Sequence, residues 1–145
     1  MSLFSSLSVS ASGMNAQRTR AELLVENLAN AETTRTPEGG PYRRKDVVFQ
    51  SQGVEAPFSG VLANEMNGGS TGVGISDVIV DQRDPEKRYL PGHPDAGSDG
   101  YVSFPRLNPA EEMVDLVSAS RGYQANVASM TSVKEMIQRS IDLLK

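Results

Sequence analysis

Hydrophobic residues recur at alternating steps of three and four at both ends of the chain, whereas the middle shows no such period. This spacing places apolar side chains along one side of a helix and is typical of helices that pack lengthwise on other helices. The residues predicted to pack in this way are Phe4, Leu7, Met14, Val25 and Leu28 at the N-terminal end, and Met113, Leu116, Tyr123, Val127, Met130, Ile137, Ile141 and Leu144 at the C-terminal end.

Glycine and proline divide the chain into three parts. All eight prolines and eleven of the thirteen glycines lie between Pro37 and Pro109, where they interrupt any long helix. We therefore predict an N-terminal helix within residues 1–36, a central β-rich insert over residues 37–107, and a C-terminal helix within residues 108–145. The predicted fold class is α+β, in which the two long helices form an antiparallel coiled-coil pair.

Local signals set the boundaries of these elements. The first helix is expected to start among the serines near the N-terminus and to fade at Asn30. Asn108 is a good N-cap, and Pro109 suits the first position of the second helix. Strands are expected at residues 42–50, 73–81 and 101–104, with a short extended piece at residues 87–90.

Bulky residues are scarce in the predicted helices. Six of the eight aromatic residues lie in the insert, and six of the first twelve residues are serine. Little apolar area is then available at the ends to offset the entropy of ordering them. We therefore expect any compact core of the monomer to lie in the insert, and the helices to become ordered only against neighbouring subunits.

Three residues, Arg18, Ser120 and Lys134, stand at helix positions where an apolar residue is expected. Polar residues at such positions lower stability, but they can define the register of packed helices. We expect the core to lie between the two helices of one chain, with their outer surfaces facing other subunits.

The charge and composition exclude several functions. The net charge is −4, and no basic surface typical of nucleic-acid binding is visible. No apolar run approaches about 18 residues, so membrane insertion is not expected. The chain has no cysteine, which excludes disulfides and thiolate metal sites. No secretory signal is recognisable, so the protein is expected to be cytoplasmic or exported without cleavage.

One loop contains candidate chemistry. His93 lies close in sequence to Asp95 and Asp99, and this combination could bind a metal ion or act in acid–base catalysis. The alternative is a surface loop in which proline, glycine and aspartate define turns. The ligand set is too small for a strong metal prediction, and no cofactor motif is present, so neither an enzyme nor a cofactor is expected.

The short basic run of Arg43, Arg44 and Lys45, together with Arg35, permits two interpretations. These residues could contact an acidic surface of a partner. They could equally line the solvated edge of a strand, where charge discourages misassembly.

Several segments resemble a known family. Residues 10–18 (SASGMNAQR) and 26–31 (ENLANA) resemble the N-terminal signature of the bacterial flagellar axial proteins, which form rod, hook and filament. Further segments resemble the proximal rod proteins of the C type, and together they extend over nearly the whole chain. These are residues 33–44 (TTRTPEGGPYRR), 91–96 (PGHPDA), 100–102 (GYV), 108–116 (NPAEEMVDL) and 118–126 (SASRGYQAN).

The resemblance implies a non-enzymatic structural subunit of the flagellar basal-body rod, the helical drive shaft that transmits torque across the periplasm. It implies export without cleavage through the flagellar type III apparatus. The implied partners are other rod proteins, copies of the chain itself, and the rod-base adaptor at the export gate. The terminal helices would line the inner tube, with the insert outside. One departure is Gly97 and Ser98, where relatives are expected to be more acidic.

Two other functions remain open from the residues alone. A cytoplasmic coiled-coil adaptor would form stable helical dimers in dilute solution, whereas a rod subunit would be a monomer with disordered ends. A small metal-binding hydrolase would depend on His93 and would lose its activity in a His93→Ala variant, a change that a rod subunit would tolerate.

Overall fold

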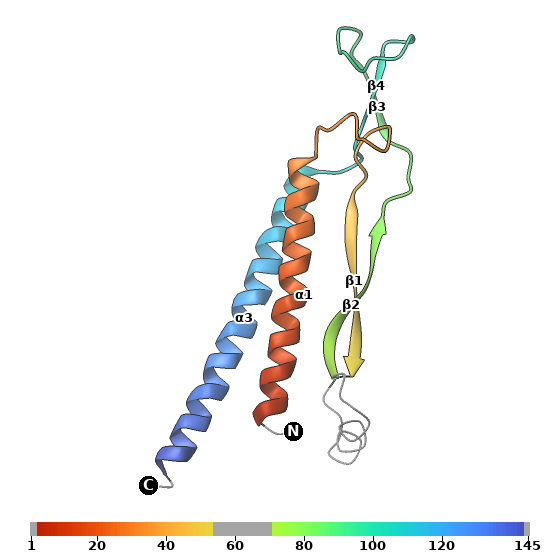
Figure 1. Cartoon of the computed structure of the whole chain (residues 1–145). Coiled ribbons are helices and arrows are strands. Elements are labelled where there is room, and N and C mark those ends of the chain that lie inside the picture. Colours follow the sequence, from red (N-terminus) through yellow and green to blue (C-terminus); the bar gives the residue numbers. More distant parts are fainter. Residues whose placement is uncertain (1–2, 54–70, 144–145) are drawn as a thin grey trace.

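A computed structural model describes residues 3–53 and 71–143 of the chain. It shows an elongated α+β architecture with a long helix near each end of the chain and a β-rich insert between them in the sequence (Figure 1). The predicted fold class and the antiparallel arrangement of the two helices are confirmed. The elements are α1 (Leu3–Ala29), β1 (Lys45–Gly53), β2 (Thr71–Val80), β3 (Glu86–Tyr89), β4 (Tyr101–Phe104) and α3 (Pro109–Asp142).

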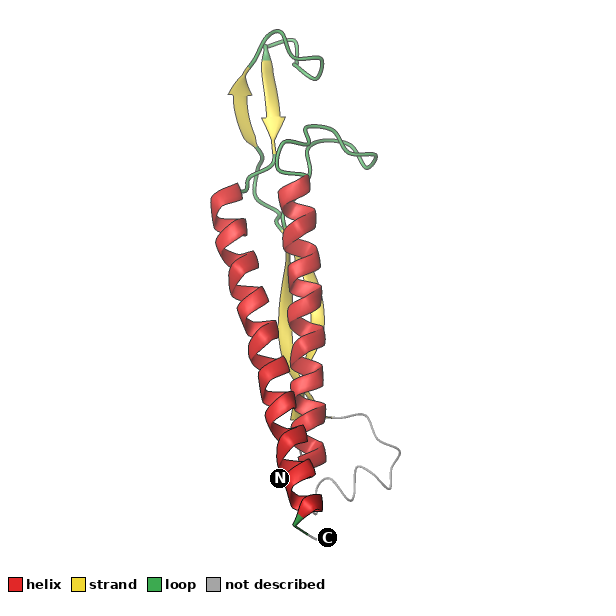
Figure 2. Ribbon diagram, turned by 90° about the vertical axis from the view of Figure 1, so that its left-hand side faces the viewer, coloured by secondary structure: helices red, strands yellow, loops and turns green. Residues whose placement is uncertain are grey.

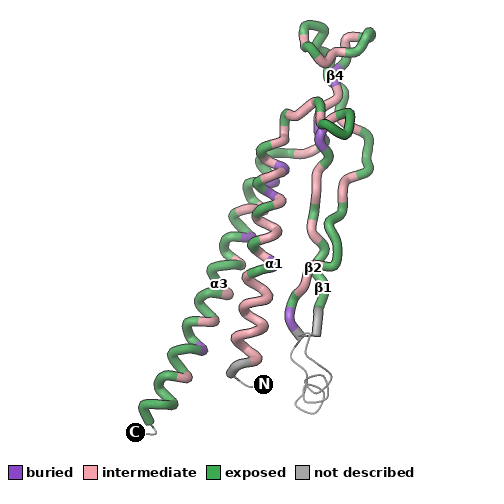
Figure 3. The backbone as a smooth tube through the Cα atoms, viewed as in Figure 1, coloured by how far each residue is buried: buried purple, intermediate pink, exposed green. Residues whose placement is uncertain are grey.

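The molecule is arranged in layers. Helix α1 lies between α3 and the β1–β2 hairpin, and it contacts both of them (Figures 1 and 2). Near the start of α1, the Ser12 hydroxyl accepts a hydrogen bond of 3.0 Å from the Val73 N–H of β2. Because α1 is covered on two sides, it is mostly half-buried, whereas α3 is covered on one side and is mostly exposed (Figure 3). The β3–β4 hairpin lies beyond the end of the helix pair.

Helix α3 begins where its capping residues predict. The Asn108 side chain accepts a hydrogen bond of 3.1 Å from the Ala110 N–H, and Pro109 occupies the first turn. Glu111 and Glu112 follow in the same turn, where the helix dipole favours negative charge. With 34 residues, α3 extends about 51 Å at a rise of about 1.5 Å per residue. In the described part of the chain, no helix is long and apolar enough to cross a membrane.

The insert consists of two antiparallel hairpins. Strand β1 pairs with β2 from Lys45 opposite Val80 to Gly53 opposite Thr71, and the register shifts by one residue next to Val48. Strand β3 pairs with the short strand β4. The expected strands are therefore confirmed within a few residues of their predicted ends.

The buried core is small and lies mainly between the helices. Among the described residues, the buried hydrophobic side chains are Ala16, Leu24, Tyr42, Val102, Ala119 and Val133. The expectation of a core between the two helices is confirmed, whereas the expectation of a compact core in the insert was wrong, since the insert contributes only Tyr42 and Val102 to these buried side chains of the described residues. Phe49, Tyr89 and Tyr101 are 37%, 64% and 46% exposed, because, within the described chain, β3 and β4 have no second layer and the β1–β2 hairpin is covered by α1 on one face only.

Candidate functional site

Two glycines allow close contact between the helices. A Cβ atom on Gly13 of α1 would lie 2.9 Å from Oδ1 of Asn126 on α3. In the reciprocal contact, a Cβ atom on Gly122 of α3 would lie 3.1 Å from Cδ of Gln17 on α1. Each glycine therefore leaves room for an amide side chain of the opposite helix. Two such contacts, four residues apart on each helix, fix the register of the antiparallel pair.

A buried asparagine joins the helices to the insert. Asn27 of α1 is 0% exposed. Its amide nitrogen donates to the Lys45 carbonyl at 2.8 Å and to the Glu112 carboxylate at 3.0 Å. Its amide oxygen accepts from the Lys45 N–H at 3.0 Å and from the Tyr42 hydroxyl at 2.9 Å. One side chain thus connects α1, the start of β1 and the first turn of α3.

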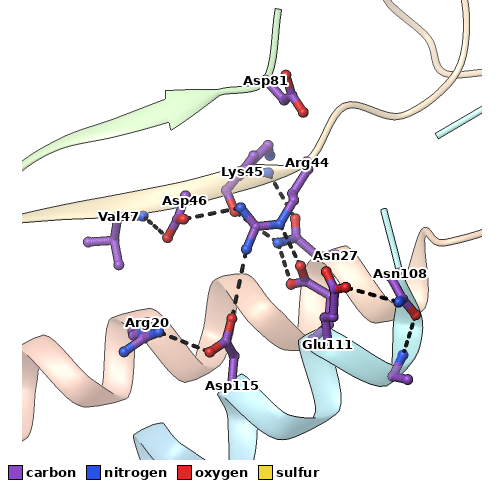
Figure 4. A network of polar contacts seen from close by, with 12 residues as sticks. Arg20, Asn27, Arg44, Lys45, Asp46, Val47, Asp81, Asn108, Glu111 and Asp115 are labelled. Carbon is purple, nitrogen blue, oxygen red and sulfur yellow. Dashed lines mark hydrogen bonds and ion pairs between the residues drawn. The ribbon is translucent and has the colours of Figure 1, made fainter. Parts of the chain in front are cut away.

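Charged residues extend this network (Figure 4). The Glu112 side chain is only 2% exposed and pairs with Arg44, which also donates to Asp46 at 3.1 Å. One turn further along α3, Asp115 pairs with Arg20 of α1 at 3.3 Å. A buried charge is tolerated only when it is paired and hydrogen-bonded, and the Glu112 carboxylate satisfies both conditions. We call Asn27, Tyr42, Arg44 and Glu112 the junction network.

The junction network changes the acidity of two of its members. Burial of the Tyr42 hydroxyl, followed by the negative charges of Glu26 and Glu112, raises the pKa of Tyr42 to about 12. Burial alone would lower the pKa of Arg44, but the hydrogen bond and charge of Glu112 raise it overall. At neutral pH, Tyr42 is therefore a neutral donor, and Arg44 is a permanent cation.

An apolar stripe on α3 has no partner within the described chain. It consists of Met113, Val117, Tyr123, Val127 and Ile141, which are between 41% and 49% exposed. We call these residues the outer stripe. They lie along one side of α3, beside the side that packs on α1, as their spacing on a helix requires. A row of exposed apolar residues on a helix is typical of a surface that packs against another helix.

An open groove borders the outer stripe. It has a volume of about 560 Å³ and lies between α1 and α3, with Gln17, Arg18 and Ala21 on one side and Leu116 and Tyr123 on the other. The groove continues the apolar surface of α3 onto α1. A further helix could therefore contact both helices of the pair at once.

The residues predicted to pack lengthwise are divided by the structure into three groups. The half-buried residues are Leu7, Met14, Leu28, Leu116, Met130 and Ile137. The exposed residues are Val25, Met113, Tyr123, Val127 and Ile141. The side chains of Phe4 and Leu144 lie outside those that the structure describes. Their contacts with other subunits stay a prediction, as do those of the exposed residues.

The hydrophobic pattern does not indicate the centre of the helix interface. On α3, buried or half-buried residues recur every seven positions at Glu112, Ala119, Asn126 and Val133. This period was available from the sequence, but three of these residues are small or polar and therefore do not resemble a hydrophobic core. Arg18, Ser120 and Lys134, the polar residues that interrupt the predicted apolar pattern, are exposed.

Several basic residues that could have bound an acidic partner are used inside the chain. Lys45 pairs with Glu26 at 2.6 Å, and Arg35 lies 3.9 Å from Asp95. Arg44 belongs to the junction network. For these three residues, the acidic partner is thus a carboxylate of the same chain.

The loop of the metal or hydrolase hypothesis is held by local contacts. The His93 ring accepts a hydrogen bond of 3.1 Å from the Asp95 N–H and lies edge-on to Phe104, with 6.3 Å between ring centroids. Asp95 accepts from the Thr34 hydroxyl at 2.7 Å, and Asp99 accepts from the Tyr101 N–H at 3.3 Å. Within residues 3–53 and 71–143, no group of three or more histidine and acidic residues could hold a metal ion.

Comparison with known proteins identifies the family. A family model described as the C-terminal part of the flagellar basal body rod FlgEFG proteins matches residues 98–143, which include β4 and all of α3. The flagellar basal-body rod protein FlgC of Bacillus subtilis (strain 168) is 43% identical over the full length of both chains. FlgC of Borreliella burgdorferi is 38% identical over all of this chain and 99% of that protein. FlgC of Salmonella typhimurium (strain LT2) is 36% identical over 99% of this chain and 98% of that protein. The chain therefore belongs to the FlgC family of flagellar basal-body rod proteins.

Proposed function

We propose that this chain builds the flagellar basal-body rod through its helix pair, with the outer stripe of α3 packed against helices of neighbouring subunits. Its family is one of structural flagellar proteins, so the chain is a non-enzymatic subunit that assembles with other basal-body proteins and serves motility. Family membership gives no support to a hydrolase or to a cytoplasmic adaptor. The unpartnered outer stripe is the structural observation that supports the proposed contact.

The proposal extends to the individual partners that would bind this surface. The outer stripe and the adjoining groove would receive helices from copies of this chain and from other rod proteins, including the rod-base adaptor at the export gate. A contact that repeats head-to-tail without closing gives a helical tube, as a rod requires. In this arrangement residues 1–36 and 108–145 form the inner coiled-coil layer, and the insert of residues 37–107 lies outside.

The small intrachain core supports a route to the assembly site. A chain that buries few large side chains on its own can pass unfolded through the type III export channel without a large energetic barrier. The helix pair would refold at the growing rod in the periplasm, where neighbouring helices cover the outer stripe and complete its packing. Folding and assembly would thus be coupled.

The test introduces a charge on the outer stripe. In a strain that lacks its own FlgC gene, Val127→Asp and Ile141→Asp should abolish motility while the variant protein still reaches the culture supernatant. Ser132→Asp is the matched control, because Ser132 is exposed on α3 away from the stripe, and it should leave swimming unchanged. Normal swimming of the Val127→Asp strain would refute the proposed contact. Failure of the unaltered chain to restore swimming would refute the function itself.

A further inference from the structure

Four arginines surround a small pocket at the junction between the helix pair and the insert. The pocket has a volume of about 20 Å³, enough for one small polar group. Proline and tyrosine side chains form its rigid walls, and Asp81 lies beside Arg44 on the side away from the helices (Figure 4). The lining residues are Pro41, Tyr42, Arg43, Arg44, Asp81, Arg83, Pro85 and Arg106.

The positive charges at this pocket are incompletely neutralised. Arg44 is bound to Glu112 of the junction network. Arg83 forms a two-pronged ion pair with Asp81, at 2.9 Å from Nε and 2.6 Å from Nη2. Arg43 donates only to the neutral main-chain oxygen of Asp81, at 3.1 Å.

The charge of Arg106 acts on Asp81 without a direct bond. It helps to lower the pKa of Asp81 to about 2, after the larger effect of the hydrogen bonds from Arg83. Within the described part of the chain, however, Arg106 forms no hydrogen bond and no ion pair of its own. Asp84, the next acidic residue along the chain, is exposed and forms no ion pair with these arginines in the same part. Arg83 thus occupies the carboxylate of Asp81, and within the described residues Arg43 and Arg106 have no bound carboxylate.

We propose that Arg43 and Arg106 bind an aspartate or glutamate side chain of an adjacent rod subunit, which places one carboxylate oxygen in this pocket. The planar guanidinium group presents its N–H donors in a fork that matches a carboxylate. The inference rests on the proposed function, because it requires a neighbouring subunit. A subunit of similar composition is a ready source, since this chain itself has 18 acidic residues against 14 basic ones.

Arg106→Glu is the most direct test, because this arginine makes no bond within the described chain whose loss would disturb folding. Removal of one partner from a desolvated charge pair weakens an interface by about 30-fold or more. We therefore expect Arg106→Glu, alone or with Arg43→Glu, to abolish swimming and to leave few completed rods in electron micrographs. Lys87→Glu, on an exposed position of β3, is the matched charge-reversal control and should swim normally. Circular dichroism should show equal helix content in the two variants.

Suppressor mutations identify the occupant of the pocket. Starting from the non-motile Arg106→Glu strain, we expect motile revertants in which an acidic residue of a rod protein has become lysine or arginine.

Normal swimming of both the Arg106→Glu strain and the strain that combines it with Arg43→Glu would overturn the proposal. Suppressors confined to Asp81 or Arg83 would also overturn it, since they would assign the arginines to internal stability. Binding of inorganic phosphate to the purified chain, with assembly independent of Arg106, would assign the pocket to a free anion and overturn it as well. These outcomes leave the proposed function intact if the unaltered chain restores swimming.

Discussion

Substitution of Asn27 tests whether the junction network holds the helix pair against the insert. Replacement by alanine removes the partner of four groups: the N–H and C=O of Lys45, the Tyr42 hydroxyl and one oxygen of Glu112. Each buried polar group left without a partner costs about 1–3 kcal/mol. The Tyr42 hydroxyl can turn, and Glu112 keeps its pair with Arg44, so the two main-chain groups of Lys45 dominate. We expect Asn27→Ala to lower the free energy of unfolding by about 3–5 kcal/mol.

The variant Asn27→Asp separates shape from hydrogen bonding. It preserves the size and the accepting oxygen, but it places a carboxyl group against the Lys45 carbonyl and the Glu112 carboxylate. Burial and the Glu112 charge must raise the pKa of the introduced carboxyl above its unfolded value of about 3.9. The folded state then holds a proton that the unfolded state has lost, so stability falls as the pH rises above about 4. We therefore expect this variant to be strongly destabilised at pH 7 and to recover toward pH 4.

Urea unfolding followed by circular dichroism measures both effects on the purified chain. Asn15→Ala is the matched control, because Asn15 is exposed on the same helix and its change should leave stability equal or slightly higher. The reasoning would be refuted if Asn27→Ala lowered the free energy of unfolding by less than about 1 kcal/mol, which is the effect of an average substitution. A pH-independent loss in Asn27→Asp would contradict the electrostatic part of the argument.

Two further predictions concern the helix interface and the alkaline limit of stability. Gly13→Ala should crowd the Asn126 amide, so a double-mutant cycle with Asn126→Ala, measured by thermal unfolding, should give a coupling of about 0.5–3 kcal/mol; additive effects would contradict the contact. Because the pKa of Tyr42 is raised to about 12 in the folded chain, stability should be lost as the pH rises from about 10 to about 12. Ultraviolet titration should show one phenol that ionises near pH 12 and is missing in Tyr42→Phe, and ionisation of Tyr42 near its unperturbed value of about 10 would contradict its burial.

The extent of each element was predictable because its signals are local. Asn108 and Pro109 mark the start of α3 within one turn of chain, and the predicted end of the first helix at Asn30 lies next to the observed end of α1 at Ala29. The alternation of Tyr101 and Ser103 with Val102 and Phe104 indicates β4 in the same way. Such signals depend on neighbouring residues alone and therefore need no knowledge of the tertiary fold.

The packed side of each helix was less predictable, because small and polar residues form it. Ala119 is 1% exposed and Asn27 is 0% exposed, yet neither has the character of a large core residue. Glu112 could be explained from the sequence by the helix dipole alone. Its burial requires Arg44, which lies 68 residues earlier in the chain and returns to α3 only in the folded structure. Contacts over such a separation have no signature in the hydrophobic pattern.

The division between small buried residues and large exposed ones also explains why a rod subunit has a polar network at its centre. Large apolar residues on the inner side would make the helix pair stable alone, and the same residues would then be missing from the surface that other subunits need. Small residues at the interface let the helix backbones approach closely. They define the register of the two helices only weakly, since they offer few distinct contacts. The hydrogen bonds of Asn27 and the ion pair of Glu112 define the register of the helix pair, because each is satisfied in one register only. The outer stripe is thereby held at a fixed angle to the insert. We infer that a subunit with its junction network disrupted would still be exported but would present the stripe to its neighbours in the wrong orientation.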